Sequence, residues 1–308
     1  MEKQTTLSAK QRLIRSSSKN PGETRGKILV SLCALIIIIA TLSITLFLAI
    51  KGLQSFIVNG LNPLEFLFSS EWNPTSSDPQ YGALPFILGS LAVTLLSALI
   101  AGPLGIGCAI FMTEISTSIG KKVLQPVIEL LVGIPSVVYG FIGLTVLVPF
   151  IRNTFSGSAT GFSLLTGTIV LSVMILPTVT TIATDAMSSL PNSLREGSLA
   201  LGATRWQTIK KVLIPAALPS LMTAIVLGMA RAFGEALAVQ MVIGNVRDLP
   251  GSLLDPSATL TTIITLNMGY TTYGSVDNNT LWSMGLILLI ISFIFILIIR
   301  YLSARRKI

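Results

Sequence analysis

Two charged residues, Arg231 and Glu235, lie close together in an otherwise apolar stretch of the sequence. They are four residues apart, so in a helix they share one face and can pair. Gly228 extends this face with a residue that has no side chain. A buried arginine in a membrane needs a partner, and its planar fork of N–H donors suits an oxyanion. The pattern predicts either a contact for a translocated anion or a structural ion pair that locks helices together.

A second informative segment is polar and lies between two apolar stretches. Ser193 and Glu196 have the spacing of a capping box, which would begin a short helix. Gly202 stands where this helix would end, and a glycine there can adopt the left-handed conformation. Residues 204–214 would form a second, amphipathic helix that stops at Pro215. The segment is predicted to be a rigid helix-turn-helix; the alternative is a well-capped connecting loop.

Several kinds of chemistry lack the residues they need. The sequence has no histidine, which removes the commonest general base and metal ligand. Cys33 and Cys108 each lie in an apolar run without neighbouring ligands, and we expect both to be buried as small hydrophobic residues. Gly120-Lys121 is the nearest approach to a phosphate-binding loop, but it lacks the upstream glycine and the hydroxyl. We expect no catalytic residue, metal or cofactor, and a membrane enzyme is the least favoured function.

The composition indicates an all-α integral membrane protein. The chain is 51% hydrophobic and 11% charged, whereas soluble domains are about a quarter charged, and its mean hydropathy is +0.79. A membrane span needs roughly 20 apolar residues. Six stretches qualify: 28–50, 84–112, 124–149, 163–183, 219–243 and 281–299. The shorter Thr-rich stretch 257–270 is expected to be an interfacial or re-entrant piece.

The distribution of basic residues predicts the orientation. With both termini in the cytoplasm, 17 of the 21 Lys and Arg residues lie on the inner side. The net charge of +8 therefore reflects membrane topology, with lipid and not nucleic acid as the partner. The predicted parts are a disordered cytoplasmic basic tail 1–27, a first membrane helix 28–50, an extracytoplasmic loop 51–83, a five-helix core 84–302 that includes the inner loop 185–218, and a cytoplasmic tail 303–308.

Four other residues in or near the spans are open to interpretation. Glu114 and Glu129 fall near the cytoplasmic ends of their spans, where a structural role is the better prediction. Pro135 and Pro177 lie inside spans three and four, where a lost backbone hydrogen bond predicts a kink. The sequence does not separate a hinge from a simple bend.

The inner loop resembles the EAA loop of ABC-importer permeases. The shared pattern is Glu196, then Gly202, then Val212 and Ile214-Pro215. It departs from the family in Gly197-Ser198 for Ala-Ala, in Val212 for Ile and in Ile214 for Leu, all of them small or apolar replacements. The resemblance implies that this coupling loop docks on an ATPase subunit, with the contact residues at Glu196, Gly202, Ala203 and Pro215.

Other segments are similar to the PstC family of phosphate-importer permeases. They are Trp72-Asn73-Pro74, residues 81–87, residues 129–140 and Arg231-Ala232-Phe233-Gly234-Glu235. The resemblance implies a MetI-like bundle of six membrane helices with a cytoplasmic coupling helix. It also implies four kinds of partner: membrane lipid, a second permease like PstA, two ATPase subunits like PstB, and an extracytoplasmic phosphate-binding protein like PstS.

These features favour transport of inorganic phosphate across the cytoplasmic membrane by alternating access, with ATP hydrolysed on other subunits. Permeases for other oxyanions, such as molybdate or sulfate, remain open. A secondary transporter or channel that works without ATP is a different class. The coupling loop and the lack of an evident inverted repeat count against that class.

Overall fold

The structure is a computed structural model of the chain and describes residues 21–155 and 160–304. The chain separates into two units, Met1–Ile50 and Lys51–Ile308. Helix α2 (Pro21–Ile57) forms the whole described part of the first unit and continues into the second.

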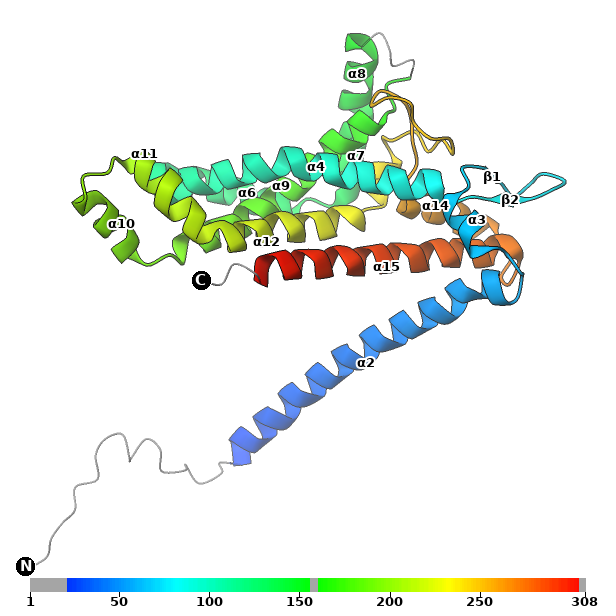
Figure 1. Ribbon diagram of the computed structural model, residues 1–308, viewed down its shortest axis with the longest axis horizontal. Coiled ribbons are helices and arrows are strands. Elements are labelled where there is room, and N and C mark those ends of the chain that lie inside the picture. Colours follow the sequence, from blue (N-terminus) through cyan, green and yellow to red (C-terminus); the bar gives the residue numbers. More distant parts are fainter. Residues whose placement is uncertain (1–20, 156–159, 305–308) are drawn as a thin grey trace, which may run out of the picture. The chain divides into compact units, whose positions relative to one another are not determined.

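The second unit is nearly all helix, with one short hairpin (Figure 1). In chain order its elements are α3 (Pro63–Phe68), β1 (Trp72–Asn73), β2 (Gln80–Tyr81), α4 (Leu84–Ile110), the π-helical turn η1 (Phe111–Ile115), α5 (Thr117–Ile119), the π-helical turn η2 (Gly120–Leu124), α6 (Gln125–Gly133), α7 (Ser136–Ile142), the π-helical turn η3 (Gly143–Leu147), α8 (Val148–Thr154), α9 (Leu164–Ser188), α10 (Asn192–Ala200), α11 (Arg205–Thr208), the π-helical turn η4 (Ile209–Leu213), α12 (Ile214–Phe233), α13 (Leu237–Gln240), α14 (Leu260–Asn267), the 3₁₀ turn η5 (Met268–Tyr270) and α15 (Val276–Ala304).

Four helices form the centre of this unit. Helices α4, α9 and α12 pack against one another, and α12 also packs against α15 (Figure 1). The side chain of Val179 on α9 lies between two glycines: a Cβ added to Gly105 would be 2.8 Å from its Cγ1, and one added to Gly228 would be 2.7 Å from its Cγ2. Small residues let membrane helices approach this closely, so the glycines are part of the packing.

The predicted number of membrane spans is confirmed within the described residues. Six helices there are long and apolar enough to cross a membrane: Arg25–Ile57, Leu84–Ile115, Ser136–Thr154, Leu164–Ser188, Arg205–Phe233 and Val276–Ile298. The all-helical fold class is also as predicted.

The third predicted span, 124–149, is wrong in its continuity. Helix α6 ends before Pro135, and the helix long enough to span begins at Ser136. A proline lacks the N–H that would continue the ladder, so the chain turns there. The hydroxyl of Tyr139 donates to the carbonyl of Leu131 at 2.8 Å and holds the two pieces together across the break.

The fifth predicted span, 219–243, is wrong at both ends. The helix continues through Pro215 instead of stopping there, because the preceding turn η4 is π-helical. The Ile214 N–H at the end of this turn donates to the Ile209 carbonyl. At the other end the helix stops at Phe233, and the chain continues as α13, which packs on α7. A Cβ added to Gly140 on α7 would lie 2.9 Å from the Cα of Ala238 on α13.

Smaller corrections concern the connecting segments. The loop predicted over 51–83 contains the end of α2, helix α3 and the hairpin. The predicted disorder of 1–27 is wrong for residues 21–27, which are helical, and residues 1–20 lie outside the described part. The stretch 257–270 contains the short helix α14, which packs on α4 and α15, and the turn η5; its interfacial or re-entrant placement stays a prediction. Cys33 is exposed and Cys108 partly exposed, so neither is buried as predicted.

Candidate functional site

The coupling loop forms two short helices at one end of the central bundle, α10 and α11 (Figure 1). The predicted capping box of Ser193 and Glu196 is wrong. Pro191 occupies the N-cap of α10 without a side-chain hydrogen bond, so Ser193 already lies inside the first turn. The capping box belongs to α11, where the Thr204 hydroxyl accepts from the Gln207 N–H and the Gln207 side chain accepts from the Thr204 N–H.

The predicted left-handed turn at Gly202 is confirmed, with φ +79. The Gly202 N–H donates to the Leu199 carbonyl at 2.9 Å, and the Ala203 N–H donates to the Ser198 carbonyl at 3.2 Å. This pair of bonds is a Schellman motif, which satisfies the last carbonyls of α10 and fixes the reversal into α11.

The outer surface of the two helices carries exposed apolar side chains next to an exposed acid. The Leu201 side chain is 90% exposed and Trp206 is 61% exposed. Glu196 is exposed on α10, and nothing lies within 4 Å of a Cβ added to Gly197. Exposed apolar side chains that gather next to an acid favour an interaction surface here.

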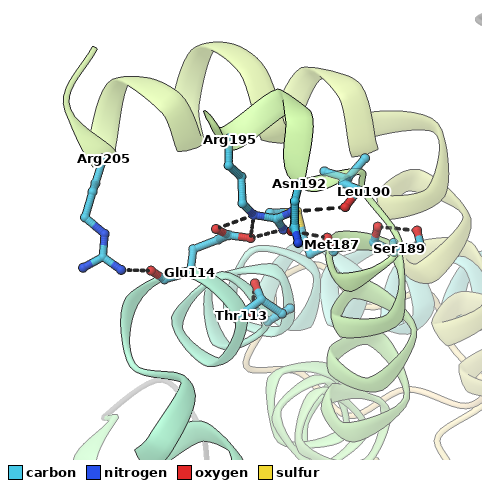
Figure 2. A network of polar contacts seen from close by, with 10 residues as sticks. Thr113, Glu114, Met187, Ser189, Leu190, Asn192, Arg195 and Arg205 are labelled. Carbon is cyan, nitrogen blue, oxygen red and sulfur yellow. Dashed lines mark hydrogen bonds and ion pairs between the residues drawn. The ribbon is translucent and has the colours of Figure 1, made fainter. Parts of the chain in front are cut away.

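The inner surface of the loop is held by a charge pair (Figure 2). Glu114, from the π-helical turn η1 that continues α4, faces Arg195 of α10, and the Arg195 Nη2 lies 2.6 Å from the Glu114 Oε1. The Arg195 Nε donates to both oxygens of the Glu114 carboxylate, at 3.2 and 3.1 Å. The exposed fractions of the two side chains are 23% for Arg195 and 9% for Glu114. The pair is therefore a largely buried, bidentate ion pair.

The same arginine also joins a third segment. Its Nη2 donates to the Met187 carbonyl in the last turn of α9 at 3.2 Å, and its Nη1 donates to the Leu190 carbonyl just after α9 at 3.1 Å. Arg205 of α11 donates to the Glu114 backbone carbonyl at 3.0 Å (Figure 2). The hydrogen bond to Glu114 raises the pKa of Arg195 above its ordinary value. We name Glu114, Arg195 and Arg205 with these bonds the clamp.

No local pattern in the sequence indicates the clamp. The sequence predicts a structural role for Glu114, and it does not indicate the partner, because Arg195 is 81 positions away. No local spacing connects residues so far apart, and the only available signal was that an acid near a span end needs a partner.

A cleft of ≈ 500 Å³ lies beside the clamp. Its lining includes Glu129 and Asp185 together with Arg195. Arg195 is already bonded to Glu114, and Glu129 is exposed and accepts only from Gln125, at 3.0 Å, among the described residues. With two acids and an engaged cation, the cleft does not suit an anion.

Arg231 lies in the last turn of α12 and not halfway along a span. Its Nη1 donates to the Thr178 hydroxyl of α9 at 3.0 Å, and within the described residues no carboxylate lies within ion-pair distance of it. The residue is exposed in the single chain. Within the described part of the chain, most of its donors therefore have no partner and can meet another molecule.

Glu235 is not the partner of Arg231, and the predicted shared helix face is wrong because α12 ends between them. The Glu235 carboxylate accepts from the Ala238 N–H at 3.1 Å, which caps the short helix α13. Its backbone carbonyl accepts from the Thr261 hydroxyl at 2.8 Å. Gly228 is buried against α9, where it provides close packing. A pathway role for these two residues stays a prediction.

Comparison with known proteins identifies the class. A family model described as "Binding-protein-dependent transport system inner membrane component" matches residues 101–308. The chain belongs to this family, the permease subunits of ABC importers, and is a multi-pass membrane protein.

The relatives that match over most of their length are named as permease proteins. The chain is 73% identical over 303 residues to the "Probable ABC transporter permease protein YqgH" of Bacillus subtilis, covering 98% of each chain. It is 36% identical over 258 residues to the "Phosphate transport system permease protein PstC" of Mesorhizobium japonicum, covering 78% of each chain. It is 32% identical to the PstC protein of Haemophilus influenzae, covering 92% of this chain and 94% of the relative.

Solved structures share the fold. An inward-facing structure of the MetNI methionine ABC transporter aligns with a TM-score of 0.56 at 20% identity, over 70% of this chain and 92% of that one. A bacterial alginate ABC transporter aligns with a TM-score of 0.63 at 18% identity, over 92% and 98%. At these identities the likeness concerns the fold alone, and it confirms the MetI-like bundle.

Proposed function

We propose that this chain is a permease subunit that carries inorganic phosphate across the cytoplasmic membrane by alternating access with a related permease. The observation that supports this most directly is Arg231. Its planar fork has one neutral partner, Thr178, and no acid close by in the described chain. A guanidinium with free donors suits the oxygens of a phosphate, which it can bind in bidentate fashion.

The similarity to PstC proteins supports phosphate as the substrate. An arginine in a membrane-spanning helix is costly unless it meets an opposite charge or a polar cavity. In the proposed mechanism the passing anion provides that charge for part of the transport cycle. Gly228 and Glu235 act behind Arg231, by packing α12 on α9 and by fixing the start of α13.

The coupling loop supplies the link to ATP. We propose that its exposed surface around Glu196, Leu201 and Trp206 docks on an ATPase subunit of the PstB kind. The left-handed turn at Gly202, continued by Ala203, sets the angle between the two docking helices, and Pro215 marks where the second helix enters the span. Both termini and this loop face the cytoplasm. A PstS-like binding protein delivers phosphate to the other side, and a PstA-like permease completes the pathway.

The test is uptake of radiolabelled phosphate by vesicles that contain the reconstituted four-component complex. Wild type should take up phosphate only with both ATP and the binding protein. Arg231→Ala should lose uptake while the complex still assembles, and Arg231→Lys should recover little, because an ammonium cannot reproduce bidentate contacts. Normal uptake per assembled complex in Arg231→Ala would refute the role of Arg231.

A second candidate is another oxyanion, molybdate or sulfate. The relative at 73% identity is named only as a probable ABC transporter permease, without a substrate. Competition by each oxyanion in the same vesicles separates the candidates. Uptake of sulfate or molybdate with no uptake of phosphate would move the assignment to that anion and leave the rest of the mechanism in place.

A further inference from the structure

Helix α10 has few attachments of its own. None of its residues is buried, and it lies between Pro191, a residue without an N–H, and the left-handed turn at Gly202. A nine-residue helix with a turn at each end can rotate as a unit unless side chains hold it. Among the described residues, Leu194 packs partly on the core and the Ser198 hydroxyl bonds to that of Thr208 at 2.9 Å.

The strongest attachment of α10 is Arg195. Its guanidinium bonds to the carboxylate of Glu114, in the turn η1 that continues α4, and to two carbonyls in the last turn of α9 and just after it. These bonds join the coupling helix to the second and fourth membrane spans at one point (Figure 2). Arg205 adds a bond from α11 to the same glutamate backbone.

The geometry points to a positioning role, and we propose that the Glu114–Arg195 pair is the joint through which displacement of α10 is transmitted to the membrane helices. The proposal rests on the docking of the coupling loop to an ATPase, as proposed above. When the ATPase moves α10, the pair carries the displacement to α4 and α9 together. Neither residue touches the transported anion; both act by fixing the helix that does touch the ATPase.

The pair is needed for transmission because α10 is attached by an ion pair and not by buried apolar side chains. A helix packed by apolar side chains transmits force over a broad surface, but α10 buries no residue. A bidentate ion pair fixes distance and direction together. Without it, a push on α10 would be absorbed by rotation about the turns at Pro191 and Gly202, and ATP hydrolysis would continue without transport.

The experiment uses the complete complex in vesicles and compares Glu114→Gln with wild type. Three quantities are measured: the amount of ATPase bound, the rate of ATP hydrolysis, and phosphate uptake per assembled complex. We expect the ATPase to stay bound and hydrolysis to continue, while uptake per ATP hydrolysed falls by about tenfold or more. An unchanged ratio of uptake to hydrolysis would overturn the proposal.

The matched control is Glu129→Gln. This variant removes an acid from the cleft beside the clamp, and Glu129 forms no ion pair in the described chain. It should keep the wild-type ratio. The double variant Glu114→Gln with Arg195→Gln separates transmission from mere stability, because it leaves no charge unpaired. We expect the double variant to assemble and remain uncoupled. Recovery of coupled uptake, or failure of both variants to assemble, would show a purely structural pair and overturn the joint.

A readout without a substrate keeps this test distinct from that of the phosphate assignment. Hydrogen exchange of the amides in residues 192–200 should become faster in Glu114→Gln and stay unchanged in Glu129→Gln. If wild type hydrolyses ATP but takes up no phosphate, the phosphate assignment fails, and this exchange decides whether the pair holds α10. Equal exchange in wild type and Glu114→Gln would show that it does not.

Discussion

Two arginines of this chain lie in opposite chemical surroundings. Arg195 is held by a carboxylate, by two backbone carbonyls and by the Asn192 amide oxygen. Arg231 has one hydrogen bond, to a threonine hydroxyl, and no acid at ion-pair distance in the described residues. The first is mostly buried and the second is exposed in the single chain. The two arginines differ in how many of their N–H donors are already hydrogen-bonded.

The two arginines therefore suit different roles in the proposed mechanism. A guanidinium whose donors are all engaged serves as a fixed connection, because breaking it would leave a buried acid without a partner. A guanidinium with free donors can bind an anion for part of a cycle and then release it. A carboxylate beside Arg231 would compete with phosphate for the same fork, and the structure places Glu235 elsewhere, at the start of α13.

An all-or-none experiment tests on which side of the membrane the loop with Arg195 lies. Single cysteines are introduced at Ser193 and at Ser77 in a chain without Cys33 and Cys108; both serines are exposed. An impermeant thiol reagent added to sealed cells should label position 77 and leave position 193 unlabelled until the cells are opened. Labelling of position 193 from outside would reverse the predicted orientation.

The largest energetic difference is expected between the alanine variants of the two arginines. Arg195→Ala leaves Glu114 as an unpaired, largely buried charge, at a cost of about 3–5 kcal/mol. Arg231→Ala removes one neutral hydrogen bond and should cost about 1 kcal/mol. Thermal unfolding of the purified subunits should show a much lower Tm for Arg195→Ala. Similar Tm values would mean that the clamp contributes little to stability.

A smaller effect is expected at the turn between α10 and α11. Nothing lies within 4 Å of a Cβ added to Gly202, so the cost of Gly202→Val comes from its φ of +79 alone. A β-branched residue there costs about 1–2 kcal/mol. The subunit should insert in the membrane and bind less ATPase, measured by co-purification. Gly202→Asn is the control, because asparagine tolerates this conformation better. Equal loss in both variants would remove the turn as the cause.

The sequence predicted what local spacing and hydropathy determine. The six spans and the left-handed Gly202 belong to this class, because a run of apolar residues or a glycine after a helix is sufficient to specify them. The continuation through Pro215 was missed because it depends on a π-helical turn, which has no strong sequence signal. The end of α12 at Phe233 was missed because apolar residues continue beyond it, packed as α13 on α7. The partners of Glu114 and Arg231 are tertiary contacts that no spacing indicates.

The smallest predicted effect concerns the single bond that Arg231 makes. Thr178→Val removes the hydroxyl with little change of volume at a half-buried position, and it should cost about 1 kcal/mol or less in stability. If the hydroxyl orients the guanidinium for the anion, phosphate uptake per assembled complex should fall by about two- to fivefold. Thr178→Ser keeps the hydroxyl and should stay close to wild type. A loss as large as that of Arg231→Ala would mean that Thr178 contacts the anion itself. No loss would mean that Arg231 is oriented by something other than α9, such as the second permease, and the contrast with the fully engaged Arg195 would then be greater.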